Sequence, residues 1–213
     1  MIKSVYNYPV STLLDIESGV VYAIPRYQRE YTWSRVQWDA LLDDLLDNEL
    51  HYFLGSIICI NQSQDALAVQ ELELVDGQQR MTTVSILLAA IYDIFSKQPN
   101  LVMDQQMELY NLRHKLILKK MPNQPRLIPQ VQNNNQQDYF SVLGQIGVLQ
   151  DIETVANAGN RRVFKAFRHF LSRSNLYLEH SDDPLTTLQG LLEKVNTATL
   201  VKNLAGSLTC TNS

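Results

Sequence analysis

The sequence predicts an α+β protein, in which a small mixed sheet with helices is followed by a mainly helical region. Two β-rich runs, FLGSIICI at 53–60 and AVQELELV at 68–75, are separated by a polar loop, and this pattern predicts a hairpin. The apolar residues of 78–97 recur at helical spacing. Beyond Pro99 the patterns are nearly all helical, so we expect one unit over 1–98 and a second over 101–213.

The remaining elements of the first unit are short. We expect a helix capped by Ser11 that ends at Gly19, and then a strand over 20–24 that Pro25 terminates. Ser34 and Gln37 fit a capping box, which predicts a helix over 35–49. The aspartates of this helix lie largely opposite its leucines. Because no His or Cys joins them, the pattern favours a solvated face over a metal site.

In the second unit we expect helices at about 101–120, 134–146, 160–173 and 184–196. Asp183-Pro184 is typical of a helix start, with proline at the first helical position. The last residues, LAGSLTCTNS, are small and polar and indicate a truncation or a non-native tail. Cys59 lies inside an apolar strand and is expected to be a buried, inert thiol.

Composition excludes several classes of protein. The chain has 213 residues, 45% of them hydrophobic, and a net charge of −4, which excludes wholesale disorder. Two cysteines cannot form a disulfide framework or a C-x-x-C zinc site. No apolar run is long enough to span a membrane, so we expect a cytoplasmic protein without a membrane partner.

The charge is distributed unevenly along the chain. Residues 1–110 hold 15 Asp and Glu against 6 Lys and Arg, whereas residues 111–213 hold 7 against 12. On average the first half should therefore repel a DNA backbone, while the basic second half could contact one.

The first candidate motif is IPRYQREYTW at 24–33, which follows the predicted strand. It places polar and aromatic side chains within eight positions: Arg26, Tyr27, Gln28, Arg29, Tyr31 and Trp33. One interpretation is an arginine site framed by aromatic rings and able to bind phosphate. The other is a loop whose aromatic side chains fill the core while its arginines pair with acids. The pattern leaves both open.

The second motif is LELVDGQQRMTT at 72–83, where a strand ends in Asp-Gly and a helix begins at once. The free N–H groups and the dipole of a helix start attract an anion, and Gly77 would let a ligand approach the backbone. Arg80 in the first turn is unfavourable unless an anion offsets it. Thr82 and Thr83 add hydroxyl donors. Asp76 could cap the helix, bind a ligand hydroxyl or bind Mg²⁺.

Other reaction classes lack their motifs. The sequence contains neither G-x-x-x-x-G-K-[ST] nor G-x-G-x-x-G, and its four histidines do not show metal-ligand spacing. No nucleophilic set and no HNH nuclease cluster is visible.

Together, I-P-x-Y-Q-R-x-Y-x-W, F-L-G-S-I-I and L-V-D-G-Q-Q-R-x-T-T resemble the GmrS-type N-terminal domain of GmrSD-like, modification-dependent (type IV) restriction endonucleases. The resemblance is strong over residues 5–96 and weaker over 101–200. It implies a ParB/sulfiredoxin-like fold, with nucleotide binding and hydrolysis at D-G-Q-Q-R.

The resemblance also implies roles for individual residues. It gives catalytic roles to Asp76, Gln79 and Arg80, and nucleotide-binding roles to Arg26, Gln28, Arg29, Tyr31, Trp33, Gly55, Gly77, Gln78, Thr82 and Thr83. We therefore expect Gln28, Arg29 and Arg80 to converge on one cleft. The implied ligand is GTP, UTP or ATP with Mg²⁺, which phosphate oxygens would hold without a metal cluster of the protein.

Members of this family usually continue into an F-x-x-L-N-x-R-G-like motif and an HNH nuclease domain, and this chain ends before both. The expected function is that of a regulatory NTPase of a restriction or phage-defence system, which gates a nuclease domain or subunit supplied elsewhere. DNA could bind through the basic second half. Two alternatives stay open: a non-enzymatic ParB-like DNA-binding module, against which the acidic first half argues, and an inactive truncated remnant.

Overall fold

The computed structural model describes residues 2–61, 69–152 and 161–205. These residues form one six-stranded mixed sheet, in the order β1-β6-β3-β4-β2-β5. The strands are β1 (Ile2–Pro9), β2 (Val20–Ala23), β3 (Phe53–Asn61), β4 (Gln70–Asp76), β5 (Leu127–Ile128) and β6 (Thr199–Ala205).

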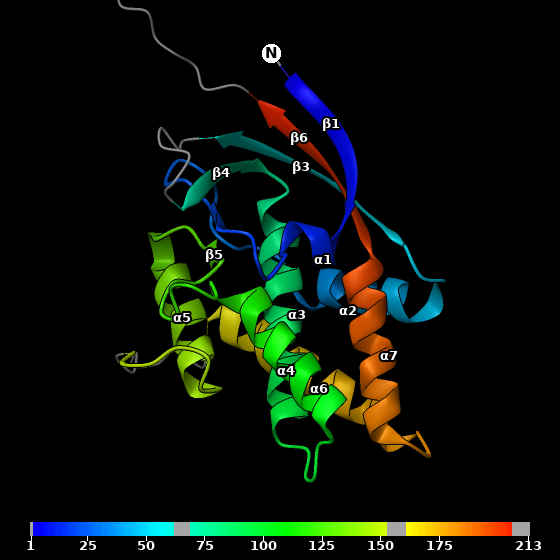
Figure 1. The fold of residues 1–213 in the computed structure, drawn as a ribbon. Coiled ribbons are helices and arrows are strands. Elements are labelled where there is room, and N and C mark those ends of the chain that lie inside the picture. The colour runs from blue at the N-terminus through cyan, green and yellow to red at the C-terminus, as the bar shows by residue number, and fades with distance from the viewer. Residues whose placement is uncertain (1, 62–68, 153–160, 206–213) are drawn as a thin grey trace, which may run out of the picture.

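The described residues also form seven α-helices, which Figure 1 shows gathered on one side of the strands. They are α1 (Val10–Leu13), α2 (Arg35–Asp47), α3 (Gln78–Ser96), α4 (Met103–Leu116), α5 (Asn135–Gln145), α6 (Arg162–Glu179) and α7 (Pro184–Thr197). None of the described helices is both long enough and apolar enough to cross a membrane.

The predicted hairpin is confirmed, because β3 and β4 pair in antiparallel fashion. The strand expected at 20–24 is confirmed as β2, which pairs in parallel with β4. Two local signals are also confirmed. The Gln37 side chain accepts a hydrogen bond from the Ser34 backbone at the start of α2, and Asp183 caps α7 by accepting one from Thr186 N.

The sheet extends beyond the elements that the sequence predicts. β1 was not predicted, and two strands, β5 and β6, come from the region expected to be mainly helical. β6 lies between β1 and β3, and Figure 1 shows β1 and β6 side by side. These pairings join residues far apart in the chain, and local patterns do not reveal them. The domain boundary near residue 100 stays a prediction.

The first helix also differs from expectation. α1 covers only Val10–Leu13 and does not reach Gly19, and its N-cap is Pro9 rather than Ser11. The chain leaves β1 at Pro9, whose ring fixes φ, so the helix begins directly after the strand.

α3 is the central helix of the core. From Gln78 to Phe95 every residue except Arg80 is buried, so the helix is enclosed on all sides rather than amphipathic. It packs beneath the sheet against α4, α6 and α7. The core therefore holds α3 rigidly, and with it the first turn, which carries the second motif.

Candidate functional site

The junction between β4 and α3 is built around Gly77. This residue is the N-cap of α3 and has left-handed backbone angles, with φ at 79°. A Cβ atom there would lie 2.7 Å from the Ser56 carbonyl oxygen and 2.7 Å from Ile57 Cγ2 on β3. Glycine is thus required both by the turn and by close packing of the helix start on the neighbouring strand.

Asp76 does not cap α3, which corrects one of the roles considered for it. It ends β4 and is exposed, and the cap position belongs to Gly77, which has no side chain to accept a hydrogen bond. The first N–H groups of an α-helix have no partner within the helix. The start of α3 therefore keeps the positive end of a 19-residue helix without a side-chain cap.

Arg80, the third residue of α3, lies against β3. Its Nη1 donates a hydrogen bond of 3.1 Å to the Ser56 carbonyl oxygen. The guanidinium also packs on Gly55, where a Cβ atom would lie 2.7 Å from Arg80 Cζ. Gly55, expected to sit beside the site, thus makes room for the one cation of the first turn of α3.

Gln28 reaches the same helix start from the other motif. Its amide nitrogen donates to the Val75 carbonyl oxygen at 2.8 Å, and its amide oxygen accepts from Gln78 Nε2 at 3.1 Å. Residues 50 positions apart in the sequence are thereby joined. The side chains of Arg26 and Arg29, from the same loop, are exposed.

Gln79 is a buried bridge between α3 and the 30–33 loop. Its Oε1 accepts hydrogen bonds from Thr32 N at 2.7 Å, from Trp33 N at 3.3 Å and from the Thr32 hydroxyl at 3.3 Å. Its Nε2 donates to the Glu30 carbonyl oxygen at 2.8 Å. The side chain, expected to be catalytic, uses both ends of its amide to hold this loop.

A chain of hydrogen bonds continues below Gln79. The Trp38 indole donates to the Tyr31 hydroxyl at 2.8 Å, and the Tyr31 and Thr83 hydroxyls are 2.7 Å apart. Thr83 in turn donates to the Gln79 carbonyl oxygen, as Thr82 does to that of Gln78. Burial raises the pKa of Tyr31 above its ordinary value. The hydroxyl protons of Thr82 and Thr83 are thus both bonded to backbone carbonyl oxygens of α3.

The two motifs meet at α3 from opposite sides. Gln28 follows β2, which pairs with β4 on one side, whereas Arg80 contacts β3, which pairs with β4 on the other. Of the aromatic residues expected to frame the site, Tyr31 is buried and Trp33 is half-buried against the core. The loop thus combines both interpretations of the first motif, with aromatic side chains packed inward and arginines facing solvent.

The acidic side of α2 is more than a solvated face. Asp39 contacts His169 Nε2 at 2.8 Å and Arg173 Nη1 at 3.1 Å, and Asp43 accepts from Arg173 Nη2 at 2.6 Å. These contacts fasten α2 to α6, and the sequence pattern of either helix alone does not predict them. Within the described residues, no cluster of His, Cys, Asp and Glu could hold a metal ion.

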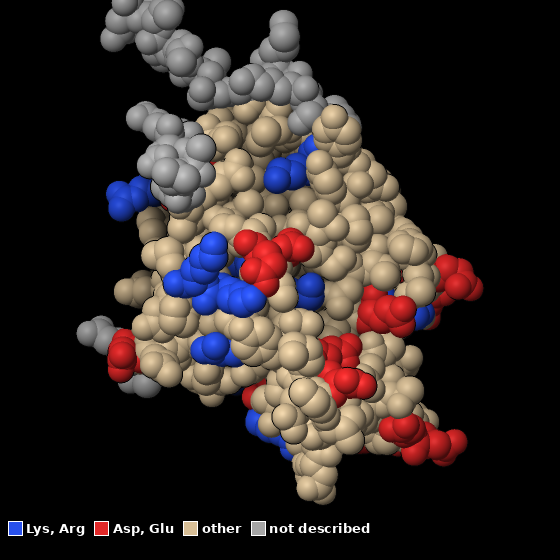
Figure 2. Space-filling view, viewed as in Figure 1, with Lys and Arg blue, Asp and Glu red and all other residues tan. Residues whose placement is uncertain are grey.

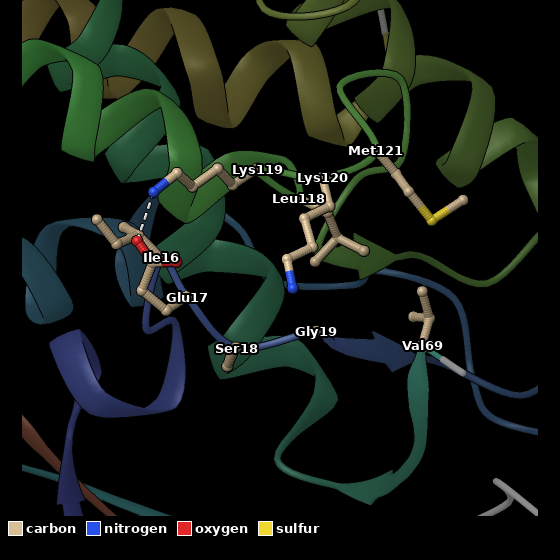
Figure 3. A pocket seen from close by; sticks show the side chains of 9 residues that line it. All are labelled: Ile16, Glu17, Ser18, Gly19, Val69, Leu118, Lys119, Lys120 and Met121. Atoms are coloured by element: carbon tan, nitrogen blue, oxygen red, sulfur yellow. Dashed lines mark hydrogen bonds and ion pairs between the residues drawn. The ribbon is translucent and has the colours of Figure 1, made fainter. Parts of the chain in front are cut away.

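A small cavity of about 240 Å³ lies apart from both motifs, between the residues that precede β2 and the loop that follows α4 (Figure 3). An ion pair between Glu17 and Lys119 lies at one side, the Lys120 side chain extends into the middle, and Met121 and Val69 lie at the opposite side. It contains none of the residues expected in the site.

Comparison with known proteins bears on both motifs at once. The family model described as GmrSD restriction endonuclease, N-terminal domain, matches residues 10–202. This span includes 24–33 and 72–83 and covers most of the chain. No curated protein matches the sequence.

Proposed function

Because the chain belongs to the GmrSD restriction endonuclease N-terminal domain family, we propose that the start of α3 binds and hydrolyses a nucleoside triphosphate. In this proposal the protein is the regulatory part of a restriction system, and nucleotide turnover gates a nuclease domain or subunit supplied elsewhere. The candidate nucleotides are GTP, UTP and ATP.

The observation that supports the proposal is Arg80 beside the uncapped start of α3. A cation in the first turn opposes the helix dipole, at a cost of about 0.3–1 kcal/mol. A bound phosphate would interact favourably with both the free N–H groups and the guanidinium. Contacts with Ser56 and Gly55 already fix the position of Arg80, so little side-chain entropy would be lost on binding.

The residues of the two motifs would then have different roles in binding and hydrolysis. Arg80 and the first N–H groups of α3 would bind phosphate oxygens, and the exposed Arg29 would add charge from the loop. Gln28 and Gln79 would position the loop through the hydrogen bonds described above. Asp76, exposed at the end of β4, would orient the attacking water or Mg²⁺.

Mg²⁺ fits this donor set as an ion carried mainly by the nucleotide. Asp76 supplies one oxygen ligand, and Mg²⁺ in phosphate sites is usually held by one or two carboxylates together with the substrate's own oxygens. When bound, the ion would neutralise charge on the phosphate chain. The protein side chains would hold the nucleotide and exclude competing orientations.

Binding of duplex DNA without nucleotide chemistry is the competing function. On the face shown in Figure 2 the Lys and Arg side chains form small groups interspersed with Asp and Glu. A duplex-binding surface needs several cations aligned with phosphates, so this face does not favour it. In our proposal DNA would bind through the basic second half of the chain, together with the nuclease.

Calorimetric titration of the 213-residue chain tests the proposal, with GTP, UTP and ATP each in the presence of Mg²⁺. Arg80→Ala would remove the two proposed charge-assisted hydrogen bonds to phosphate, of about 1.5–3 kcal/mol each, so affinity should fall roughly 100-fold or more. Arg168→Ala, an exposed arginine on α6, is the matched control and should bind as wild type does. Phosphate release measured on the same variants reports hydrolysis.

Two controls separate the competing outcomes. The melting temperature of Arg80→Ala should fall only modestly, because loss of the guanidinium bond to Ser56, worth about 1.5–3 kcal/mol, is partly offset by relief of about 0.3–1 kcal/mol of repulsion from the helix dipole. Wild-type protein that binds none of the three nucleotides, or an Arg80→Ala protein that binds them equally well, would overturn the proposal. Duplex binding that weakens steeply with salt, without nucleotide binding, would favour the DNA-binding module.

A further inference from the structure

A second cavity, of about 530 Å³, lies at the meeting point of three helices. Its lining includes the residues at which these helices begin: Ser34 and Arg35 of α2, Asn135 of α5, and Arg161 and Arg162 of α6. The three helices have 13, 11 and 18 residues, so each has a developed dipole. Three positive helix ends therefore face one hollow.

The side chains around this cavity add to the positive charge. Arg35, Arg162 and Lys165 are exposed at its rim, and the first turns of α2 and α6 contain no acidic residue. Cations at helix starts oppose the dipole, so the arrangement is unfavourable in the absence of an anion. Three described acids lie near these cations: Glu30 in the lining contacts Asn133, the buried Asp138 in the first turn of α5 pairs with Arg161 at 2.9 Å, and Asp39 pairs with Arg35 at 3.3 Å.

Asn135 provides an independent sign of a ligand. Asn135 is a lining residue of the cavity although it is only 6% exposed, and no described residue accepts a hydrogen bond from its buried Nδ2. Buried amide donors are nearly always hydrogen-bonded, because desolvation without a partner is costly. A donor held without a partner in the wall of a cationic cavity is suited to an anionic oxygen.

We propose that this cavity is a second anion site, which binds the phosphate chain of a small phosphorylated molecule. A cavity of 530 Å³ is large enough to hold a chain of two or three phosphates. The buried Tyr31 and Trp38 form part of its wall and are bonded to each other. No residue of α3 lines this cavity, although Tyr31 in its wall is hydrogen-bonded to Thr83 of that helix.

Titration with sodium pyrophosphate, without Mg²⁺ or nucleobase, tests this site directly. Lys165→Glu reverses a charge at the rim, and Arg168→Glu makes the same change in net charge on an exposed position of the same helix outside the cavity lining. We expect Lys165→Glu to weaken binding at this site at least tenfold and Arg168→Glu to weaken it less than threefold.

A second variant examines the amide. Asn135→Leu removes the donor and keeps the branched shape of the side chain, so pyrophosphate affinity should fall severalfold while the melting temperature stays the same or rises. An asparagine with a purely structural role would instead give a lower melting temperature and unchanged affinity. That result, or equal binding by the Lys165→Glu and Arg168→Glu proteins, would overturn the proposal.

Stoichiometry separates this inference from the function proposed for α3. If both hold, wild type binds two equivalents of pyrophosphate, and Arg80→Ala and Lys165→Glu each lose a different one. If only the α3 site exists, Arg80→Ala abolishes all binding and this proposal fails. If only the three-helix cavity binds, Arg80→Ala retains one equivalent and Lys165→Glu loses it, so this proposal holds while the α3 site fails.

Discussion

Replacement of Gln79 by methionine should destabilise the protein far more than a substitution of one polar side chain normally does. Gln79 is 6% exposed, and its amide makes two short and two longer hydrogen bonds to the 30–33 loop. Methionine keeps the length of the side chain and removes all four. At about 0.5–1.5 kcal/mol for each bond, with the longer pair at the low end, the free energy of unfolding should fall by roughly 2–4 kcal/mol.

The assay is thermal and urea unfolding followed by circular dichroism. For a chain of this length 1 kcal/mol shifts the melting temperature by about 2–4 °C, so we expect a fall of roughly 5–15 °C. Gln137→Met changes an exposed glutamine on α5 in the same way and should leave the melting temperature within about 1–2 °C of wild type.

Gln79→Glu sharpens the test, because it replaces only the donor. The carboxylate can still accept from Thr32, but its second oxygen would face the Glu30 carbonyl oxygen, which Nε2 now contacts at 2.8 Å. A protonated carboxyl can donate there, which raises the folded-state pKa, so this variant should gain stability relative to wild type as the pH falls toward the unfolded pKa of about 4.3, and the gain is complete below it. If the Gln79→Met protein has the melting temperature of wild type yet no longer hydrolyses nucleotide, Gln79 is catalytic and the positioning role is refuted.

Two further predictions concern Gly55 and Asp138. Gly55→Ala should lower the free energy of unfolding by about 1–3 kcal/mol, because φ is 118° at this position, and it should also displace Arg80 and weaken nucleotide binding. Gly190→Ala, in an open part of α7, should have neither effect. Burial raises the pKa of Asp138 to about 6, against the opposing effect of Arg161, so the folded state holds this proton more tightly than the unfolded chain does. The free energy of unfolding should therefore decrease by up to roughly 3 kcal/mol as the pH rises from 4 through 6. Asp138→Asn should flatten that slope in urea titrations at several pH values, and an unchanged slope would show that Asp138 titrates normally.

The parts of the fold that local chemistry determines could be predicted from the sequence. The β3–β4 hairpin follows from two β-rich runs around a polar loop, and the start of α7 follows from Asp183-Pro184. β6 could not be predicted in this way, because its partners lie at 2–9 and 53–61. β1 carries a short signal, the alternation of Tyr6 and Tyr8 with the polar Asn7.

The candidate site also has parts that the sequence predicts and parts that depend on long-range packing. The sequence and the family resemblance predict that Gln28, Arg29 and Arg80 converge on one cleft. The hydrogen bond between Gln28 and Gln78 joins the first motif to α3, and the shared cleft stays a prediction. The bridging position of Gln79 depends on where a loop nearly 50 residues away is placed, and no spacing rule encodes this. The cavity between the starts of α2, α5 and α6 could not be predicted from the sequence, because its residues come from three separate helix starts, none of which has an unusual sequence.

The position of β6 has a consequence for how the chain folds as it is synthesised. Residues 199–205 emerge from the ribosome after every other described strand, yet they separate β1 from β3 and hydrogen-bond to both. Until they emerge, β1 has no partner strand in the sheet and one edge of β3 is open, at synthesis rates of about 5–20 residues per second. The nascent chain thus exposes two strand edges for many seconds, an interval in which a chaperone or a second nascent chain could pair with them.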